Sequence, residues 1–130
     1  MIVIDGLTKR FGPFTAVDHI SFSVARGEVL GFLGPNGAGK STTMKMVTGF
    51  LSPSEGAARV CGHDVVSDTL AAQRTIGYLP EGAPAYGDMT PLAFLRFIAR
   101  VRALKGVEAE RAIEAAVAAT ELQGVLEQPI

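Results

Sequence analysis

Apolar and polar residues alternate in the N-terminal part of the chain. In the stretch "ISFSV", Ile20, Phe22 and Val24 alternate with serines, and residues 2–4 are all apolar. Such alternation is typical of a strand with one buried face, because successive side chains point to opposite faces of a sheet. We therefore expect two half-buried strands here, connected through a turn at residues 11–13.

Two other apolar runs lack this alternation. The runs "EVLGFL" at residues 28–33 and "TIGYLP" at residues 75–80 are short and nearly continuous. Continuous apolar runs are typical of strands covered on both faces, as in a parallel sheet, and the proline at the end of the second run cannot donate to a ladder. A further short strand is expected at residues 57–62, after the turn-forming residues 52–56.

Three helices are expected. The first covers residues 40–48 and ends at Gly49, since glycine takes the left-handed conformation at a helix end without steric cost. The second begins with Thr90 as N-cap and Pro91 as its first helical residue. The third covers about residues 107–122. The second helix has an apolar stripe at helical spacing, in which core packing is favoured for Leu95 and Ile98.

The amino-acid composition indicates a soluble globular domain, or part of one. The chain has 130 residues, 48% hydrophobic and 19% charged, with a formal net charge of -1. No electrostatic footprint for nucleic acid is present, and the basic residues of 96–105 fall at helical spacing, which favours a solvated face. The single cysteine, Cys61, excludes an intrachain disulfide and favours a reducing compartment. No run approaches the roughly 20 apolar residues of a membrane-spanning helix, and no secretory signal is visible.

The stretch "GPNGAGKS" at residues 34–41 matches the phosphate-binding pattern G-x-x-x-x-G-K-[ST], between an expected strand and an expected helix. Gly37 and Gly39 allow successive backbone amides to converge on a phosphate, and the helix N-terminus adds unpaired N–H groups and a partial positive charge. A glycine-rich turn without a ligand would need neither the lysine nor the hydroxyls that follow it. The predicted ATP-binding residues of this loop are Gly34, Asn36, Gly37, Ala38, Gly39, Lys40, Ser41 and Thr42.

The residues that follow the glycines each have a chemical role in this prediction. Lys40 would place its ammonium group against the β and γ phosphates and is the first predicted catalytic residue. Ser41 would ligate Mg²⁺, and Thr42 would hydrogen-bond a phosphate oxygen, because a hydroxyl is a compact ligand that adds no charge.

From this loop outward, the chain resembles the nucleotide-binding domain of the ATP-binding-cassette (ABC) transporters. The resemblance rests on "LTKRFGPFTAVDHISFSVARGEVLGFLG", "GPNGAGKST", "GFLSPSEGAARVCGHDV" and "IGYLPE". It implies an α/β fold: a P-loop NTPase core with an N-terminal antiparallel β part and the start of a helical part. It covers residues 1–130 but only the first part of the family's domain. Residues 1–80 would form the β-rich nucleotide-binding part, and residues 81–130 the Q-loop and the start of the helical part.

The resemblance assigns three further site residues. Phe11 would stack on adenine, with Phe14 as the less favoured alternative, and Val17 would contact the base and ribose. Glu81 stands where most of the family has the Q-loop glutamine, so it is predicted to lie near the metal and to be catalytic, although it could also be a loop carboxylate that faces solvent. A carboxylate there would repel phosphate unless metal or protonation neutralises it.

The resemblance implies an ATP-binding subunit that uses ATP and Mg²⁺ to drive transport, with export favoured by the "YLPE" form of the Q-loop. Its partners would be a second ATP-binding domain and separate transmembrane permease subunits, which hold it at the inner face of the cell membrane. Residues 82–104 would transmit closure to the permease. The family's signature and its later acidic and histidine residues have no counterpart in this sequence, so ATP hydrolysis is expected of the full-length protein and not of residues 1–130 alone.

Two alternatives remain open from the residues. One is another P-loop NTPase, a kinase or a GTPase. The guanine motif Asn-Lys-x-Asp is absent, and only the basic residues of 96–105 could form a kinase lid. The other is a non-catalytic module whose interactions are gated by a nucleotide.

Overall fold

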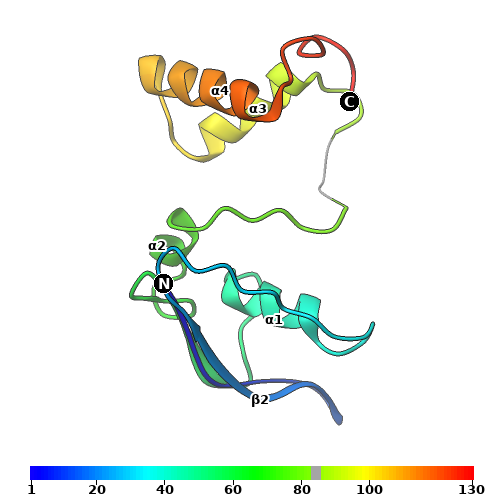
Figure 1. The fold of residues 1–130 in the computed structure, drawn as a ribbon, viewed down its shortest axis with the longest axis vertical. Coiled ribbons are helices and arrows are strands. Elements are labelled where there is room, and N and C mark those ends of the chain that lie inside the picture. Colours follow the sequence, from blue (N-terminus) through cyan, green and yellow to red (C-terminus); the bar gives the residue numbers. More distant parts are fainter. Residues whose placement is uncertain (83–85) are drawn as a thin grey trace. The chain divides into compact units, whose positions relative to one another are not determined.

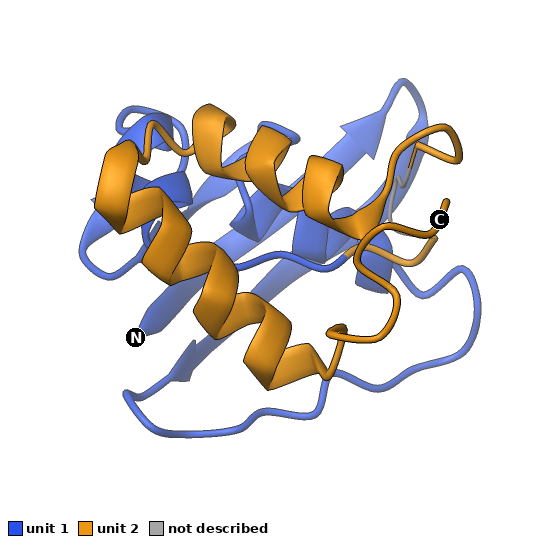
Figure 2. Ribbon diagram, turned by 90° about the horizontal axis from the view of Figure 1, so that it is seen from above, with its two compact units in different colours: residues 1–79 blue, residues 80–130 orange. Residues whose placement is uncertain are grey.

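A computed structural model describes residues 1–82 and 86–130 (Figure 1). The chain divides into two compact units, Met1–Leu79 and Pro80–Ile130, which Figure 2 colours blue and orange. The predicted transmitting segment, residues 82–104, lies partly outside the described residues. The predicted functional division between residues 80 and 81 stays a prediction.

The first unit contains a four-stranded antiparallel sheet in the order β2-β1-β3-β4. Its strands are β1 (Ile2–Phe11), β2 (Phe14–Val24), β3 (Glu55–Val60) and β4 (His63–Asp64). The strands β1 and β2 form a long hairpin, paired from Ile2 with Val24 to Phe11 with Phe14. This confirms the expected pair of N-terminal strands and the turn between them, where Gly12 takes a positive φ of 56°.

One core holds the sheet and its helices together. The helices of this unit are α1 (Lys40–Val47) and α2 (Thr69–Arg74). Apolar side chains from β1, β3 and both helices form one buried cluster, of which Leu7 and Met46 are completely buried. The expected end of α1 is confirmed, because Gly49 has a φ of +71° and a Cβ there would lie 2.9 Å from Thr69 Cγ2.

The two expected parallel strands are not formed, so this part of the prediction is wrong. Residues 28–33 and 76–80 make no strand pairing within the part of the chain that the structure describes, and Thr75 is the C-cap of α2. Val29 and Leu33 are 97% and 92% exposed. An extended segment becomes a strand only by hydrogen bonding to a neighbouring strand, and among the described residues no strand pairs with either run. An apolar run alone does not reveal whether a partner strand is present.

The second unit is a helical hairpin of α3 (Pro91–Val101) and α4 (Gly106–Thr120), shown in orange in Figure 2. Thr90 caps α3 as expected, since the backbone N–H of Ala93 donates to its Oγ1 at 3.2 Å. The small core of this unit is built on Ala99, Ile113 and Val117, with Leu95 packed against it. The core role predicted for Ile98 is wrong, because it lies on the outer side of α3 and is 37% exposed.

Candidate functional site

The glycine-rich loop is a turn that leads directly into α1. The chain before it is extended and turns back at residues 34–39 into the helix (Figure 1). Gly37 and Gly39 have φ values of 85° and 82°, in the left-handed region that favours glycine. Inside the turn, Ala38 N donates to Pro35 O at 3.2 Å, and Thr43 N donates to Gly39 O at 2.8 Å in the first turn of the helix. The loop therefore has the conformation for which its glycines were predicted.

Gly39 is required for a second reason, which is close packing against β2. A Cβ atom at this position would lie 2.4 Å from the carbonyl oxygen of Ala16 and 3.0 Å from Val17 Cγ2. Real Cβ atoms essentially never approach other heavy atoms that closely, so only glycine fits here. At Gly37, by contrast, a Cβ would meet nothing within 4 Å. The loop is thus held on β2 at its last glycine, while its middle is open.

Lys40 is the first residue of α1, and its side chain folds back over the loop. Its Nζ donates hydrogen bonds to the carbonyl oxygens of Gly34 at 2.5 Å and Pro35 at 2.7 Å. An ammonium group has three N–H donors, so these two bonds leave one donor. The positive charge of Lys40 therefore lies beside the first residues of the loop, where a bound anion would be attracted to it.

The N-terminus of α1 is uncompensated. The N-cap Gly39 has no side chain to cap it, and the first turn contains no acidic residue. The first amides of a helix have no intrahelical acceptor, and together they carry a partial positive charge. Because Thr43, Met46 and Val47 form the buried side of α1, the hydroxyl of Ser41 lies on an exposed residue next to these amides. Thr42 is half-buried.

The residues predicted to contact the base are on the β1–β2 hairpin. Val17 is 6% exposed and belongs to the main core. Phe11 ends β1 and is 49% exposed, and its cross-strand neighbour Phe14 is 62% exposed. The two aromatic residues differ in one contact, since Lys9 Nζ lies over the Phe11 ring, 5.3 Å from its centroid. The base contacts of Phe11 and Val17 stay predictions.

Glu81 belongs to the second unit and is exposed. Its placement near a metal therefore stays a prediction. Among the described residues, no group of three or more His, Cys, Asp or Glu side chains could hold a metal ion. The role of Ser41 as an Mg²⁺ ligand likewise stays a prediction.

Two contributors to the site were not recognised from the sequence. The Ala16 carbonyl packs against Gly39, and this contact depends on tertiary structure that no local pattern encodes. Lys9 precedes Phe11 by two residues on β1, which extends beyond the strand expected at residues 2–4, and residues so spaced on a strand share a face. That spacing could have identified Lys9.

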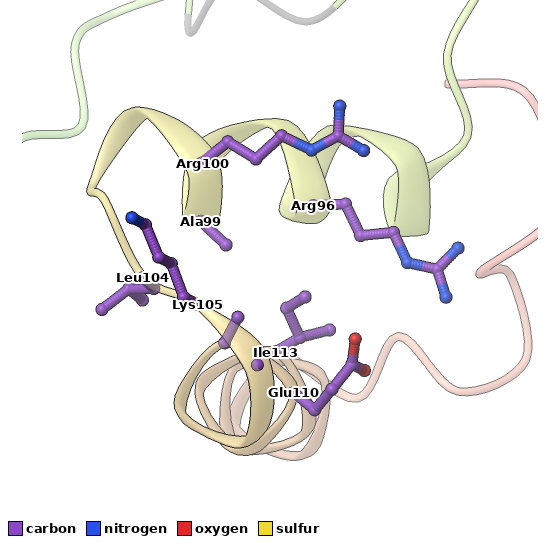
Figure 3. Close-up of a pocket in the computed structure, with 9 residues that line it drawn as sticks. Arg96, Ala99, Arg100, Leu104, Lys105, Glu110 and Ile113 are labelled. Carbon is purple, nitrogen blue, oxygen red and sulfur yellow. The ribbon is translucent and has the colours of Figure 1, made fainter.

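The second unit has a pocket of about 340 Å³ between α3 and α4 (Figure 3). Ala99, Leu104 and Ile113 contribute apolar surface. Its charged side chains are Arg96, Arg100, Lys105 and Glu110. These charged residues are exposed to solvent, which confirms the solvated face expected for the basic stretch. Gly106, with a positive φ of 51°, also lines the pocket, but no serine or threonine hydroxyl does, so we do not assign phosphate binding to it.

A glycine turn held on a strand, followed by a helix that opens with a lysine and a serine, defines a phosphate-binding loop of the P-loop class. The family model for the ABC transporter matches residues 17–130. The chain therefore belongs to the ABC transporter family, as the sequence resemblance predicted.

Curated relatives carry transport names. The chain is 48% identical to the probable multidrug ABC transporter ATP-binding protein YbhF of Escherichia coli over 100 aligned residues. The alignment covers 77% of the chain and 17% of that protein. The chain is 42% identical over 81 residues to the Nod factor export ATP-binding protein I of Ralstonia nicotianae, covering 62% of the chain and 25% of that protein. It is 34% identical over 134 residues to human ATP-binding cassette sub-family A member 2, covering 99% of the chain and 6% of that protein. The chain thus spans a quarter or less of each of these relatives.

Solved structures confirm the predicted fold. An ATP-binding subunit of an ABC transporter superposes with a TM-score of 0.85 at 28% identity, over 99% of the chain and 54% of that subunit. A dimeric bacterial ABC transporter cassette gives a TM-score of 0.82 at 19% identity, over 99% of the chain and 61% of the cassette. The chain therefore has the fold of part of an ABC ATPase domain. None of the helices in the described ranges is long and apolar enough to cross a membrane.

Proposed function

We propose that this chain forms the ATP-binding loop region of an ABC transporter ATPase. The observation that carries the proposal is the loop itself. Gly37 and Gly39 both adopt positive φ, Gly39 is locked against the Ala16 carbonyl, and Lys40 places its charge beside an uncapped helix N-terminus. Exposed amides, one cation and two hydroxyls are the groups that bind a nucleoside triphosphate.

Each predicted site residue has one role in this proposal. The backbone of residues 34–39 surrounds the phosphates, and Lys40 neutralises charge on the β and γ phosphates during transfer. Ser41 ligates Mg²⁺ when the ion is bound with the nucleotide, and this ion supplies charge neutralisation at the phosphates. Thr42 donates to a phosphate oxygen, Phe11 stacks on the base, and Val17 contacts the base and the ribose. Glu81 keeps the metal-proximal, catalytic role that the family resemblance implies.

The whole protein is proposed to hydrolyse ATP together with a second ATP-binding domain and to drive separate permease subunits at the inner face of the membrane. The names of the multidrug and Nod factor export relatives support transport in the outward direction. The matched cassette whose name describes it as dimeric supports pairing of two such domains at the level of the fold.

The deciding experiment is nucleotide binding by the protein at its full natural length, with Lys40→Ala as the test and Lys45→Ala as the control. Lys45 is an exposed lysine near the other end of α1, so the control removes the same charge from the same helix. We expect Lys40→Ala to weaken ATP binding at least about tenfold, because charge-assisted bonds to phosphate contribute about 1.5–3 kcal/mol. Lys45→Ala should bind like the natural protein.

Three outcomes would contradict the proposal. Equal ATP affinity in Lys40→Ala and the natural protein would show that the loop does not bind phosphate. Tighter binding of GTP than of ATP would favour the GTPase alternative. A folded protein that binds ATP but shows no steady-state hydrolysis at full length would favour the non-catalytic, nucleotide-gated module.

A further inference from the structure

The side chain of Lys9 connects the end of the β1–β2 hairpin with the loop before β3. Its Nζ lies over the Phe11 ring, 5.3 Å from the centroid, and also donates a hydrogen bond to the carbonyl oxygen of Ser52 at 2.7 Å. Lys9 and Phe11 are two residues apart on β1, so both side chains project from the same side of the strand. The ammonium group is therefore fixed by an anchor on another segment and is not merely adjacent to the ring.

Phe11 needs such a restraint because its place in the fold supplies little packing. It is the last residue of β1, directly before the Gly12–Pro13 turn, and it is 49% exposed. Its cross-strand neighbour Phe14 is more exposed still. A ring has two faces, and Lys9 occupies one of them. About half of the Phe11 surface remains accessible, which is what a second planar group would need for stacking.

We propose that Lys9 is a positioning residue that holds the Phe11 ring in place so that its opposite face receives the planar base of the nucleotide. The inference rests on the proposed function, since it assigns a role at the same ATP site. A cation over one face of a ring is attracted to the ring's π electrons, and the Ser52 carbonyl keeps that cation from leaving. The ring is thereby pre-organised, and less rotamer freedom is lost when the base stacks.

The test separates base recognition from phosphate recognition, in the protein at its full natural length. Lys9→Met keeps a long unbranched side chain and removes the charge, whereas Lys9→Arg keeps a cation. For each variant, competition binding gives the affinity for ATP and the affinity for inorganic tripolyphosphate, which has the phosphates without the base. We expect Lys9→Met to weaken ATP binding about two- to fivefold, from the usual strength of an exposed cation–π contact, and to leave tripolyphosphate binding unchanged. Lys9→Arg should restore ATP binding.

A double-mutant cycle shows whether Lys9 acts through Phe11. Phe11→Ala alone should weaken ATP binding, and adding Lys9→Met to Phe11→Ala should produce no further loss, because residues that act as one unit are non-additive. Lys45→Met serves as the control for loss of one positive charge elsewhere in the same unit. Lys45→Met should change neither the affinity for ATP nor that for tripolyphosphate.

The outcomes also separate this inference from the proposed function. If Phe11→Ala weakens ATP binding but Lys9→Met does not, or if the two losses add fully, the positioning role is refuted while the ATP site stands. If Lys9→Met weakens ATP and tripolyphosphate equally, Lys9 only supports the local structure. If Phe11→Ala leaves ATP affinity unchanged, both the base contact and the role of Lys9 are refuted, and Lys40→Ala then tells whether the phosphate site survives.

Discussion

Substitution of the two loop glycines by alanine should have unequal effects, because the structure places one of them in open space and the other against a backbone carbonyl. Both residues have φ values above +80°. In Gly37→Ala the new methyl group meets nothing within 4 Å. The variant therefore suffers only the left-handed backbone penalty of about 1–2 kcal/mol, of which the lower entropy of the unfolded chain offsets about 0.4–1 kcal/mol.

In Gly39→Ala the same two effects apply, and a steric effect is added. The new Cβ would lie 2.4 Å from the Ala16 carbonyl oxygen and 3.0 Å from Val17 Cγ2. A backbone oxygen cannot move aside as a flexible side chain can, so α1 must shift away from β2. Overpacking of this kind usually costs about 1–3 kcal/mol. Gly39→Ala should therefore be less stable than Gly37→Ala by about that amount, because the conformational effects cancel between the two variants.

The measurement is urea unfolding of both variants and the natural protein, followed by a probe in the first unit. A fluorophore at the exposed Cys61 reports on that unit. The reasoning is refuted if Gly39→Ala unfolds at the same urea concentration as Gly37→Ala, or at a higher one. ATP affinity measured alongside should fall in both variants, because Gly37→Ala places a methyl group in the loop that is proposed to surround the phosphates, and Gly39→Ala shifts the backbone of that loop.

Two predictions concern positions outside the loop. Thr90→Ala should lower the stability of the second unit by about 1 kcal/mol through loss of the N-cap bond to α3, as measured by urea unfolding, whereas Thr90→Ser should keep it. Backbone hydrogen bonds from Ser67 and Val66 lower the pKa of Asp64. Its contribution to stability is therefore present above the unfolded pKa of about 3.9 and lost as the pH falls below it. Asp64→Asn should show a smaller loss of stability than the natural protein between about pH 5 and pH 2, and an equal loss in both proteins would contradict the assignment.

Local patterns predicted a large part of this fold. The alternation in "ISFSV" identified β2, the Thr90–Pro91 pair placed the start of α3, and Gly49 marked the end of α1. These features are encoded by neighbouring residues, through side-chain period, capping and backbone conformation. The prediction of parallel strands at the two apolar runs was wrong. Strand formation depends on a pairing partner, and a run of apolar residues carries no information about whether such a partner is present.

The same distinction explains which parts of the site could be predicted. The motif identified Gly39 and Lys40 because phosphate binding requires glycine turns and a cation at a fixed spacing. It could not reveal that Gly39 is also wedged against Ala16, or that Lys9 is anchored on Ser52 while it covers Phe11. Both contacts join residues more than 20 positions apart. The proposed site therefore depends on the hairpin in two ways: β2 packs against the last glycine of the loop, and β1 carries the ring that is proposed to stack on the base. A substitution that shifts the hairpin should thus weaken nucleotide binding even when every residue of the motif is intact.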